Sequence, residues 1–469
     1  MHQLTAREAE LLAAESPTNL GHSSLLVEID NLHAPRGRRL TFARLKERMH
    51  DRLHLVPAFR RRVHTVPLGL DRPWWLEDPH FDLDYHLRHA GVPGEDTDGD
   101  GFVSLIARLH ERPLDRSRPL WEMYLIERPS QNPVLFVKMH HVLVDGVTGL
   151  DVLASLIDGA DDPGSAAPSD YRTDRMPDDS DLLIKAGWAM ARSPWRIAGL
   201  ALKGVSTLPV VGRINVLGLL APWATPSGAV ELPSTEQVAP RVSFNRTISS
   251  HRRVAFVSVP VHEIKALHQK LGVRFNDIVL ALVSGTLRHW LVLHDELPAE
   301  SLVALTPLLV DSVDEPLGTA LVPLATQRHD PFERLEAISG AMAHLTADIE
   351  ARPVEAIRSM YEAAPAVASL ASRLMVRTGA FTRLLPPFNV YVVNVPGGGD
   401  TATVNGVELI HQFPLATLVD GIGLAISAMS HADTVDISFV ADRDLVPDLA
   451  LMADRIPIEL EILAGRRKP

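Results

Sequence analysis

The sequence has no cysteine and fewer basic than acidic side chains. With 0 Cys in 469 residues, the chain can form no disulfide, zinc–thiolate site, iron–sulfur cluster or thiol nucleophile. Lys and Arg number 46 against 58 Asp and Glu, which gives a net charge of −12. A chain of this charge is repelled by a phosphate backbone, so we expect no nucleic acid partner. The absence of cysteine also fits a reducing cytoplasm.

The sequence also lacks an export signal and long hydrophobic runs. The charged side chains of Arg7, Glu8 and Glu10 interrupt Met1–Ser16, where a signal peptide needs an unbroken apolar stretch. The longest run without a charged residue, Ile214–Val230, spans seventeen residues and contains two prolines. It is too short and too broken for a spanning helix. We therefore expect no segment that crosses a membrane.

What the sequence does contain is an alternation of short apolar runs with amphipathic stretches, in both halves. Predicted strands are 25–29, 133–140, 252–259, 302–305, 389–395, 422–426 and 435–440. Predicted helices are 43–55, 146–157, 261–271, 276–291 and 446–462. The spacing of apolar residues supports each assignment. The alternation predicts two α/β sandwich domains rather than one helical bundle.

A segment of different composition separates the two halves. Asp158–Asp181 is rich in Asp, Pro, Ser and Ala and has no periodicity, as in a solvated linker. Leu182–Val230 then holds five basic side chains, no acidic one and three of the seven Trp. Its cations form a stripe beside an apolar helix face, which suits an anionic membrane surface. A helical connector packed on its own domains explains the same pattern, and both interpretations stay open.

One polar cluster stands where a predicted strand meets a predicted helix. His140 and His141 end the strand, and Asp145 and Gly146 precede the helix. A neutral imidazole accepts a proton at pH 7, so His141 is a candidate general base. Asp145 is close enough along the chain to fix the backbone or the ring, and Gly146 permits a tight turn. Ligands of α/β folds gather where strands end.

Other functions for these residues, and other motifs, have less support in the sequence. A hydrogen-bonded structural histidine remains an alternative. A metal site lacks a third ligand at a recognisable spacing, and we expect no metal. The stretch Asp96–Gly101 copies the first half of a calcium loop, but Ala107 stands where a bidentate Glu is required. No serine nucleophile elbow or phosphate-binding loop is present in the sequence.

The motif HHVLVDG at 140–146 resembles the HHxxxDG motif of the bacterial wax ester synthase/acyl-CoA:diacylglycerol acyltransferases. That family belongs with chloramphenicol acetyltransferase, plant acyltransferases and peptide-synthetase condensation domains. Further segments of the sequence resemble other motifs of the family, and together they span nearly the whole chain. Pro119-Leu120-Trp121 is similar to the PLW motif, Asn276-Asp277 to the ND motif, and Asn394-Val395-Pro396-Gly397 to the NVPG motif.

The resemblance implies a fold and an activity. The fold is a pair of chloramphenicol-acetyltransferase-like domains, 1–159 and 241–469, joined by a linker with amphipathic helices at 160–240. The activity is transfer of a long-chain acyl group from acyl-CoA to diacylglycerol, giving triacylglycerol, or to a fatty alcohol, giving a wax ester. Acyl-CoA is a substrate, and no cofactor is implied. A lipid-binding protein that keeps the fold without turnover is the alternative of a different class. A condensation-type amide former is disfavoured because no carrier domain is attached.

The resemblance also implies roles for individual residues. His141 takes the proton of the acceptor hydroxyl and returns it to the departing CoA thiolate, with no covalent intermediate. Asp145 is structural and pairs with an arginine, while His140 supports the site. Asn276 is a polar contributor or a helix N-cap, and Pro119, Leu120 and Trp121 form walls. The acceptors dissolve in membranes, so we expect a cytoplasmic protein in peripheral contact with a membrane or lipid droplet surface.

Overall fold

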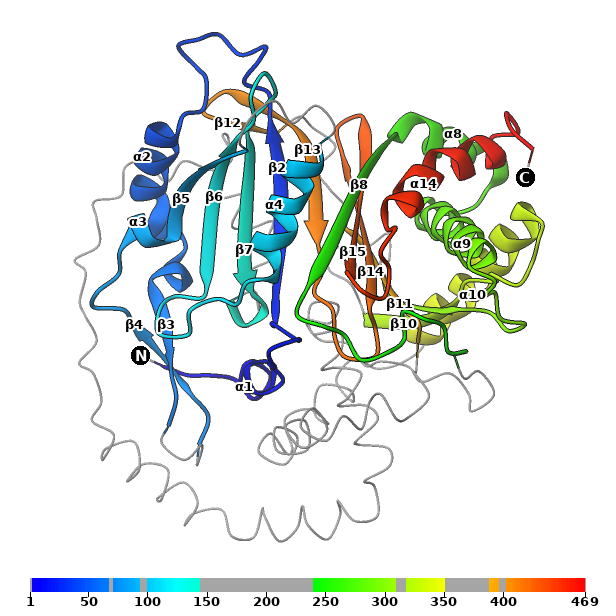
Figure 1. The fold of residues 1–469 in the computed structure, drawn as a ribbon, viewed down its shortest axis with the longest axis horizontal. Coiled ribbons are helices and arrows are strands. Elements are labelled where there is room, and N and C mark those ends of the chain that lie inside the picture. The colour runs from blue at the N-terminus through cyan, green and yellow to red at the C-terminus, as the bar shows by residue number, and fades with distance from the viewer. Residues whose placement is uncertain are drawn as a thin grey trace, which may run out of the picture.

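Two six-stranded sheets stand side by side, with helices packed against them (Figure 1). The computed structural model describes residues 2–66, 71–92, 99–143, 239–308, 318–350, 388–395 and 402–468. In both sheets the strands alternate with helices along the chain. The mixed α/β architecture expected from the sequence is therefore confirmed.

The first sheet carries the strand that ends in the histidine pair. Its order is β12 (Thr403–Val404), β13 (Val407–Leu415), β2 (His22–Ile29), β7 (Val134–His140), β6 (Trp121–Glu127), β5 (Leu87–Gly91). A smaller sheet consists of β1 (His2–Gln3), β4 (Trp74–Glu77) and β3 (Arg61–His64). The helices of this part are α1 (Ala6–Ala13), α2 (Phe42–Arg52), α3 (Leu83–His86) and α4 (Asp100–Glu111). All neighbours in the first sheet are antiparallel except β5 and β6.

The second sheet is built from the other half of the chain. Its order is β10 (Gly318–Pro323), β9 (Val303–Leu308), β11 (Val390–Val395), β14 (Leu424–His431), β15 (Thr434–Asp442), β8 (Arg252–Pro260). Its helices are α8 (Val261–Leu271), α9 (Phe275–Leu293), α10 (Pro331–Glu350) and α14 (Ala450–Leu463). They lie together on one side of the sheet (Figure 1).

Strand β13 crosses from the second half of the chain into the first sheet. It pairs antiparallel with β2, with Phe413 opposite Leu26 and Leu409 opposite Ile29. The neighbouring β12 then forms the sheet edge. The division at residues 159 and 241 stays a prediction about domains, but sheet membership does not follow it, because residues 403–415 complete the first sheet.

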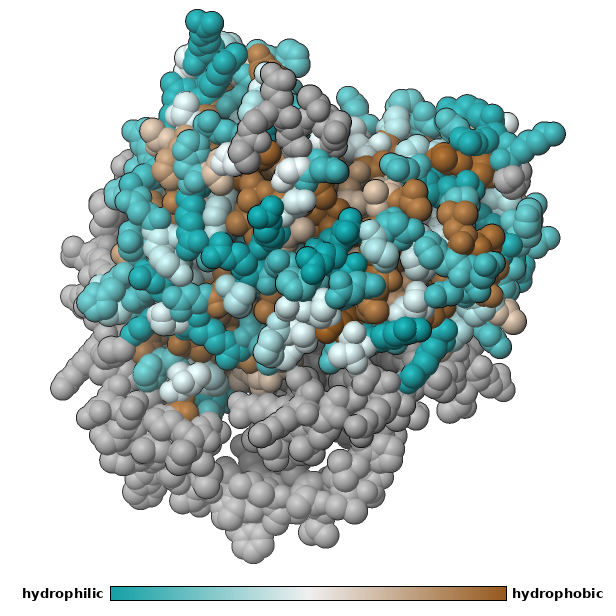
Figure 2. Space-filling model, in the orientation of Figure 1, coloured by the Kyte–Doolittle hydropathy of each residue, from teal (hydrophilic) through white to brown (hydrophobic). Residues whose placement is uncertain are grey.

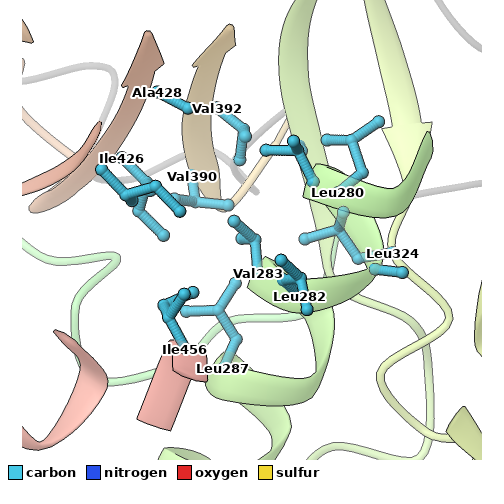
Figure 3. Packing of buried hydrophobic residues seen from close by; sticks show 14 of the residues in the cluster. Leu280, Leu282, Val283, Leu287, Leu324, Val390, Val392, Ile426, Ala428 and Ile456 are labelled. Atoms are coloured by element: carbon cyan, nitrogen blue, oxygen red, sulfur yellow. The ribbon is translucent and has the colours of Figure 1, made fainter. Parts of the chain in front are cut away.

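Helix α9 is the centre of the second core. Leu280, Val283 and Leu287 pack in one buried hydrophobic cluster with the β-strand residues Val390 and Ile426 (Figure 3). Residues on the other faces of α9 are buried as well, because α10 and α14 also pack against it. A helix that is apolar around most of its circumference is stable only in such a buried place. The long apolar stretch of 275–293 therefore fits a core helix.

A buried carboxylate joins the three helices of this core. Glu459 on α14 is 2% exposed and accepts from Arg334 on α10 at 3.1 Å and from Arg455 at 2.7 Å. The absent side chain of Gly285 on α9 makes room for it, because a Cβ at this position would collide with the Glu459 carboxylate. Close helix approach at Gly285 is thus a condition for the buried ion pairs.

The element predictions were largely confirmed. The predicted strand 252–259 is β8, and the predicted helices 261–271 and 276–291 are α8 and α9. The predicted helix 446–462 begins only at Ala450, because Asp442 Oδ1 accepts two backbone N–H groups that hold the chain in a turn before it. The calcium-like stretch leads into α4, which begins at Asp100 and was not predicted.

Some predicted features lie outside the described residues. These are the helix 146–157, the linker and the cationic segment Leu182–Val230. Within the described part of the chain, no helix is both long and apolar enough to cross a membrane.

We predict that Gly285→Ala lowers the free energy of unfolding by about 1–3 kcal/mol, because the methyl group overpacks a closed interface and displaces the Glu459 carboxylate. The matched control is Gly340→Ala on α10, where no atom beyond the neighbouring backbone of its own helix lies within 4 Å of the added Cβ. There the change should stabilise the helix by about 0.5–1 kcal/mol. Urea unfolding monitored by circular dichroism measures both, and equal effects of the two changes would contradict the packing argument.

Candidate active site

Backbone contacts from two neighbouring segments fix the histidine pair. Strand β7 ends at His140, and a 3₁₀ turn, His141–Leu143, follows at once. The His140 N–H donates to the Leu120 carbonyl at 3.0 Å, and the His141 N–H donates to the Gly21 carbonyl at 2.9 Å. The segment before β2 and the segment before β6 thus hold the two histidines from either side.

The imidazole of His140 is used on both nitrogens. Its Nδ1 accepts the Val142 N–H at 3.0 Å, so the proton of the neutral ring sits on Nε2. Nε2 then donates to Glu15 Oε1 at 2.6 Å. Burial, together with the Arg116 guanidinium, lowers the pKa of His140 to about 3, which agrees with a neutral ring. These contacts fix the tautomer and tie the ring to the backbone turn that carries His141.

Glu15 and Gly21 form the cradle for this ring. The second Glu15 oxygen pairs with the guanidinium of Arg116, which also donates to the Leu12 carbonyl at 2.8 Å. Gly21 has φ +60°, and a Cβ there would lie 2.6 Å from His140 Nε2. Only glycine fits this position without moving the histidine. No sequence pattern indicated Glu15, because its contact with His140 spans 125 residues.

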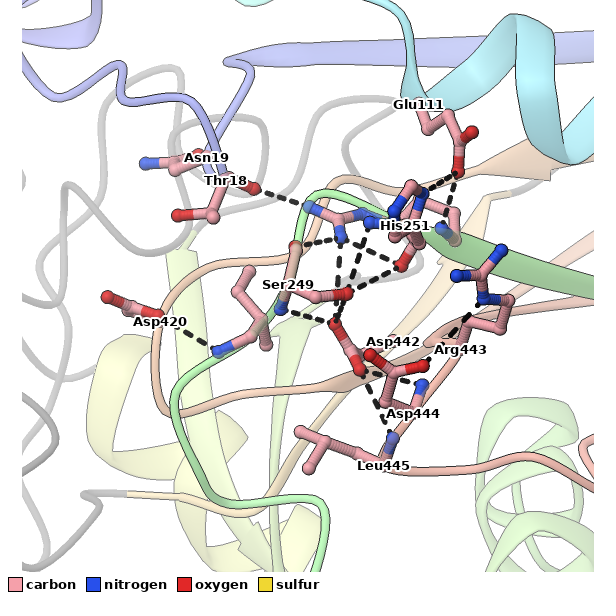
Figure 4. A network of polar contacts seen from close by, with 12 residues as sticks. Thr18, Asn19, Glu111, Ser249, His251, Asp420, Asp442, Arg443, Asp444 and Leu445 are labelled. Carbon is pink, nitrogen blue, oxygen red and sulfur yellow. Dashed lines mark hydrogen bonds and ion pairs between the residues drawn. The ribbon is translucent and has the colours of Figure 1, made fainter.

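An arginine from the second half anchors the same segment. Arg252, at the start of β8, donates to the carbonyl of Thr18, which lies between Glu15 and Gly21 (Figure 4). Its own N–H donates to Glu111 Oε2 at 2.8 Å. The guanidinium is 3% exposed and lies 3.9 Å from Asp442 Oδ2. Both halves of the chain therefore position the segment that holds the histidine pair.

His141 itself is buried, with 4% of its surface exposed. Asp145 and Gly146, predicted to support it, lie outside the described residues, so the proposed pairing of Asp145 with an arginine stays a prediction.

The PLW residues lie next to the histidines and pack in the core. Leu120 is 1% exposed and accepts the His140 N–H, and the Pro119 carbonyl accepts the Trp121 N–H. The Trp121 ring stacks between Phe59 and His86, with ring centroids 4.3 and 4.6 Å away. Its indole N–H donates to the Phe59 carbonyl at 2.9 Å. Because its indole N–H and its ring are engaged in these contacts, Trp121, the first residue of β6, acts as a packing residue of the core.

The ND residues form a second polar cluster, at the start of α9. Asn276 Oδ1 accepts from Asn394 Nδ2 at 3.1 Å, so the ND and NVPG motifs meet in space. Of the two roles left open for Asn276, polar contributor or helix N-cap, the N-cap was wrong. The cap is Arg274, and the side chain that returns to its N–H is Asp277, at 3.3 Å. Asp277 is fully buried and also accepts from Ser339 at 2.8 Å, so it organises the helix start.

The described residues hold no group of three or more His, Asp or Glu side chains arranged for a metal ion. The expectation of no metal, and of no cofactor besides the acyl-CoA substrate, stays a prediction.

Comparison with known proteins identifies the family. Residues 4–279 match the wax ester synthase/diacylglycerol acyltransferase catalytic domain, and residues 316–464 match the C-terminal domain of the same proteins. The chain belongs to the wax ester synthase/diacylglycerol acyltransferase family. It is thus an acyltransferase by family, as the motifs at 140–146, 119–121 and 276–277 indicated.

Relatives and solved structures agree with this assignment. A Mycobacterium tuberculosis protein named "Probable diacyglycerol O-acyltransferase tgs2" is 30% identical over 465 residues, covering 96% of this chain and 95% of its own. The structure of the wax ester synthase/diacylglycerol acyltransferase from Marinobacter aquaeolei VT8 has a TM-score of 0.70 at 24% identity and covers 99% of this chain and 100% of its own.

A more distant structure shares the fold. The first condensation domain of the CDA synthetase has a TM-score of 0.53 at 15% identity, covering 99% of this chain and 96% of its own. The predicted chloramphenicol-acetyltransferase-like architecture is confirmed by these two structures and by the paired sheets.

We predict that Glu15→Ala lowers kcat about tenfold to a hundredfold and leaves KM nearly unchanged, because the His140 ring and the turn behind it lose their tether. Acyl transfer from acyl-CoA, followed by thiol release, measures both constants. Glu15→Gln keeps an oxygen acceptor for Nε2–H and should retain most of the activity. Glu47→Ala, on the exposed face of α2, is the surface control. Full activity of Glu15→Ala would contradict the positioning role.

Proposed function

We propose that this family member transfers a long-chain acyl group from acyl-CoA to the hydroxyl of diacylglycerol and forms triacylglycerol. The relative named above, matched over 96% of the chain, supports diacylglycerol as the acceptor. A fatty alcohol is the second candidate acceptor, because the matched family includes wax ester synthases.

His141 acts as the general base in this proposal. The observation that carries the assignment is that both ring nitrogens of the neighbouring His140 are hydrogen-bonded. Its Nδ1 accepts the Val142 N–H, and its Nε2 donates to Glu15. A ring with both nitrogens engaged and a pKa near 3 is a poor proton acceptor at neutral pH. Of the two histidines, His141 is therefore the one suited to the chemistry, and His140 shapes the turn that presents it.

The reaction needs one proton relay and no covalent enzyme intermediate. The His141 ring removes the proton from the acceptor hydroxyl as its oxygen attacks the thioester carbonyl. The C–S bond then breaks, and the imidazolium gives the proton to the departing CoA thiolate. General-base help contributes roughly 10²–10⁴ in rate. The remaining acceleration must come from holding the two substrates in line. We assign this role to the turn His141–Leu143, which follows the two histidine N–H groups bound by the Gly21 and Leu120 carbonyls.

The acceptor lipids reside in membranes and lipid droplets, so the enzyme must work at their surface. We propose that the protein is cytoplasmic and associates peripherally with such a surface through the basic, Trp-bearing segment Leu182–Val230. Basic side chains beside apolar ones bind anionic lipid surfaces.

We predict that His141→Ala lowers acyl transfer by about 10²–10⁴. Labelled palmitoyl-CoA is offered with diacylglycerol, with hexadecanol or without acceptor, and the products are separated by thin-layer chromatography. Triacylglycerol as the main product supports the proposed acceptor, and wax ester as the main product replaces it. Binding of lipid without any product would favour the non-catalytic alternative. His262→Ala, at an exposed position on α8, should leave the rate unchanged, and equal loss in both variants would refute the role of His141.

We predict that changing Lys185, Arg192, Arg196 and Lys203 to Glu reduces recovery of the protein with floating anionic liposomes, because the cationic stripe becomes anionic. Floating with neutral liposomes is the control for non-electrostatic binding. Unchanged recovery with anionic liposomes would eliminate this segment as the membrane contact.

A further inference from the structure

A recess of about 240 Å³ lies between the two sheets, away from the histidine pair. Strands β2 and β13 form its floor, and α4 and β8 lie side by side on its flanks, where hydrophilic and hydrophobic residues are mixed on the face seen in Figure 2. From Leu26, the recess residue on β2 nearest the histidine pair, to His22, which pairs with His140, β2 runs four residues, or about 13 Å. This recess is therefore separate from the site described above.

The floor consists of two cross-strand residue pairs, here called the polar rung and the apolar rung. His411 on β13 lies opposite Glu28 on β2, and two residues further along Phe413 lies opposite Leu26. Residues two apart share a face of a strand, so the two rungs are about 7 Å apart on one surface. Phe256 from β8 packs on Phe413 with ring centroids 5.1 Å apart. The recess is thus amphipathic along its length.

Two cations border the polar rung. The Arg128 guanidinium lies 3.0 Å from Glu28 Oε2 and above the Phe102 ring at 4.8 Å. The His411 Nδ1 lies 2.9 Å from Asp436 Oδ1, and a hydrogen bond from Nδ1 to this fully buried carboxylate raises the pKa of His411. The charged or titratable side chains that line the recess are Arg128, Glu28 and His411, and Asp436 lies directly behind His411.

The contacts of His411 leave one ring nitrogen for a ligand. Asp436 also accepts from Ser258 at 2.6 Å and from the Gln412 N–H at 2.6 Å. These bonds to Asp436 attach β13 to the second sheet, and the bond from His411 already uses its Nδ1. In the part of the chain that the structure describes, no hydrogen bond uses Nε2, and the side chain is 30% exposed.

We propose that the recess binds a medium-chain fatty acid, with the carboxylate between His411 and Arg128 and the chain over Phe413. The imidazolium Nε2–H and the guanidinium donate charge-assisted hydrogen bonds to the carboxylate. The recess volume of about 240 Å³ has room for a short ligand such as octanoate. This proposal does not depend on the acceptor or the mechanism proposed above.

Isothermal titration calorimetry of the full-length protein with octanoate tests the proposal. We expect one saturable site near pH 6. Affinity should fall about tenfold or more near pH 9, because His411 loses its positive charge while Arg128, Glu28 and Asp436 keep theirs. Acetate, which has only the headgroup, and 1-octanol, which has only the chain, should each bind at least tenfold more weakly. Octanol binding as tight as octanoate would overturn recognition of the carboxylate.

Two variants with a changed recess side chain test whether octanoate binds in the recess. His411→Gln keeps an amide to face Asp436 but cannot titrate, so it should weaken octanoate binding about tenfold and remove its pH dependence. Phe256→Ala should weaken binding by loss of the apolar wall, and thermal unfolding checks that both variants fold. His262→Gln is the surface control. Unchanged affinity in both recess variants, or complete displacement of octanoate by long-chain acyl-CoA in the wild type, would place the ligand elsewhere and overturn the proposal.

Discussion

The pairing of β13 with β2 is the constraint on which the arrangement of the two sheets depends. A strand that follows the second sheet's β11 in the chain completes the first sheet, so its backbone hydrogen bonds hold the halves together. Asp436 reinforces this from the second sheet, through His411 and the Gln412 N–H. An edge of β2 left unpaired would expose its N–H and C=O groups. The relative position of the two sheets is therefore set by main-chain bonds as well as by side-chain packing.

The histidine turn is held by neighbours that are rigid for identifiable reasons. His140 is buried, neutral and locked as one tautomer by Glu15 and Val142. The segment containing Glu15 and Gly21 is in turn held by Arg252 from the second half. A base that must meet two separate substrates benefits from such fixation, because a small misplacement costs much of the rate. Structure and proposed chemistry are linked through this one short segment.

Much of the local structure was predictable. The runs 252–259, 261–271 and 276–291 show their strand and helix periods directly in the sequence. Helix α4 was missed because its acidic, glycine-containing start resembles a calcium loop, and β13 was missed because His411, Gln412 and Pro414 interrupt its apolar pattern. In both cases tertiary burial outweighed the local signal.

The sequence by itself determined the family and the position of the histidine pair, because these depend on motifs and on short-range periodicity. The tertiary structure alone decided which carboxylate holds His140, which residue caps α9, and how Phe413 and His411 come to line a recess with β8. Such contacts join residues far apart in the chain, and their energies depend on burial and geometry that no local pattern encodes.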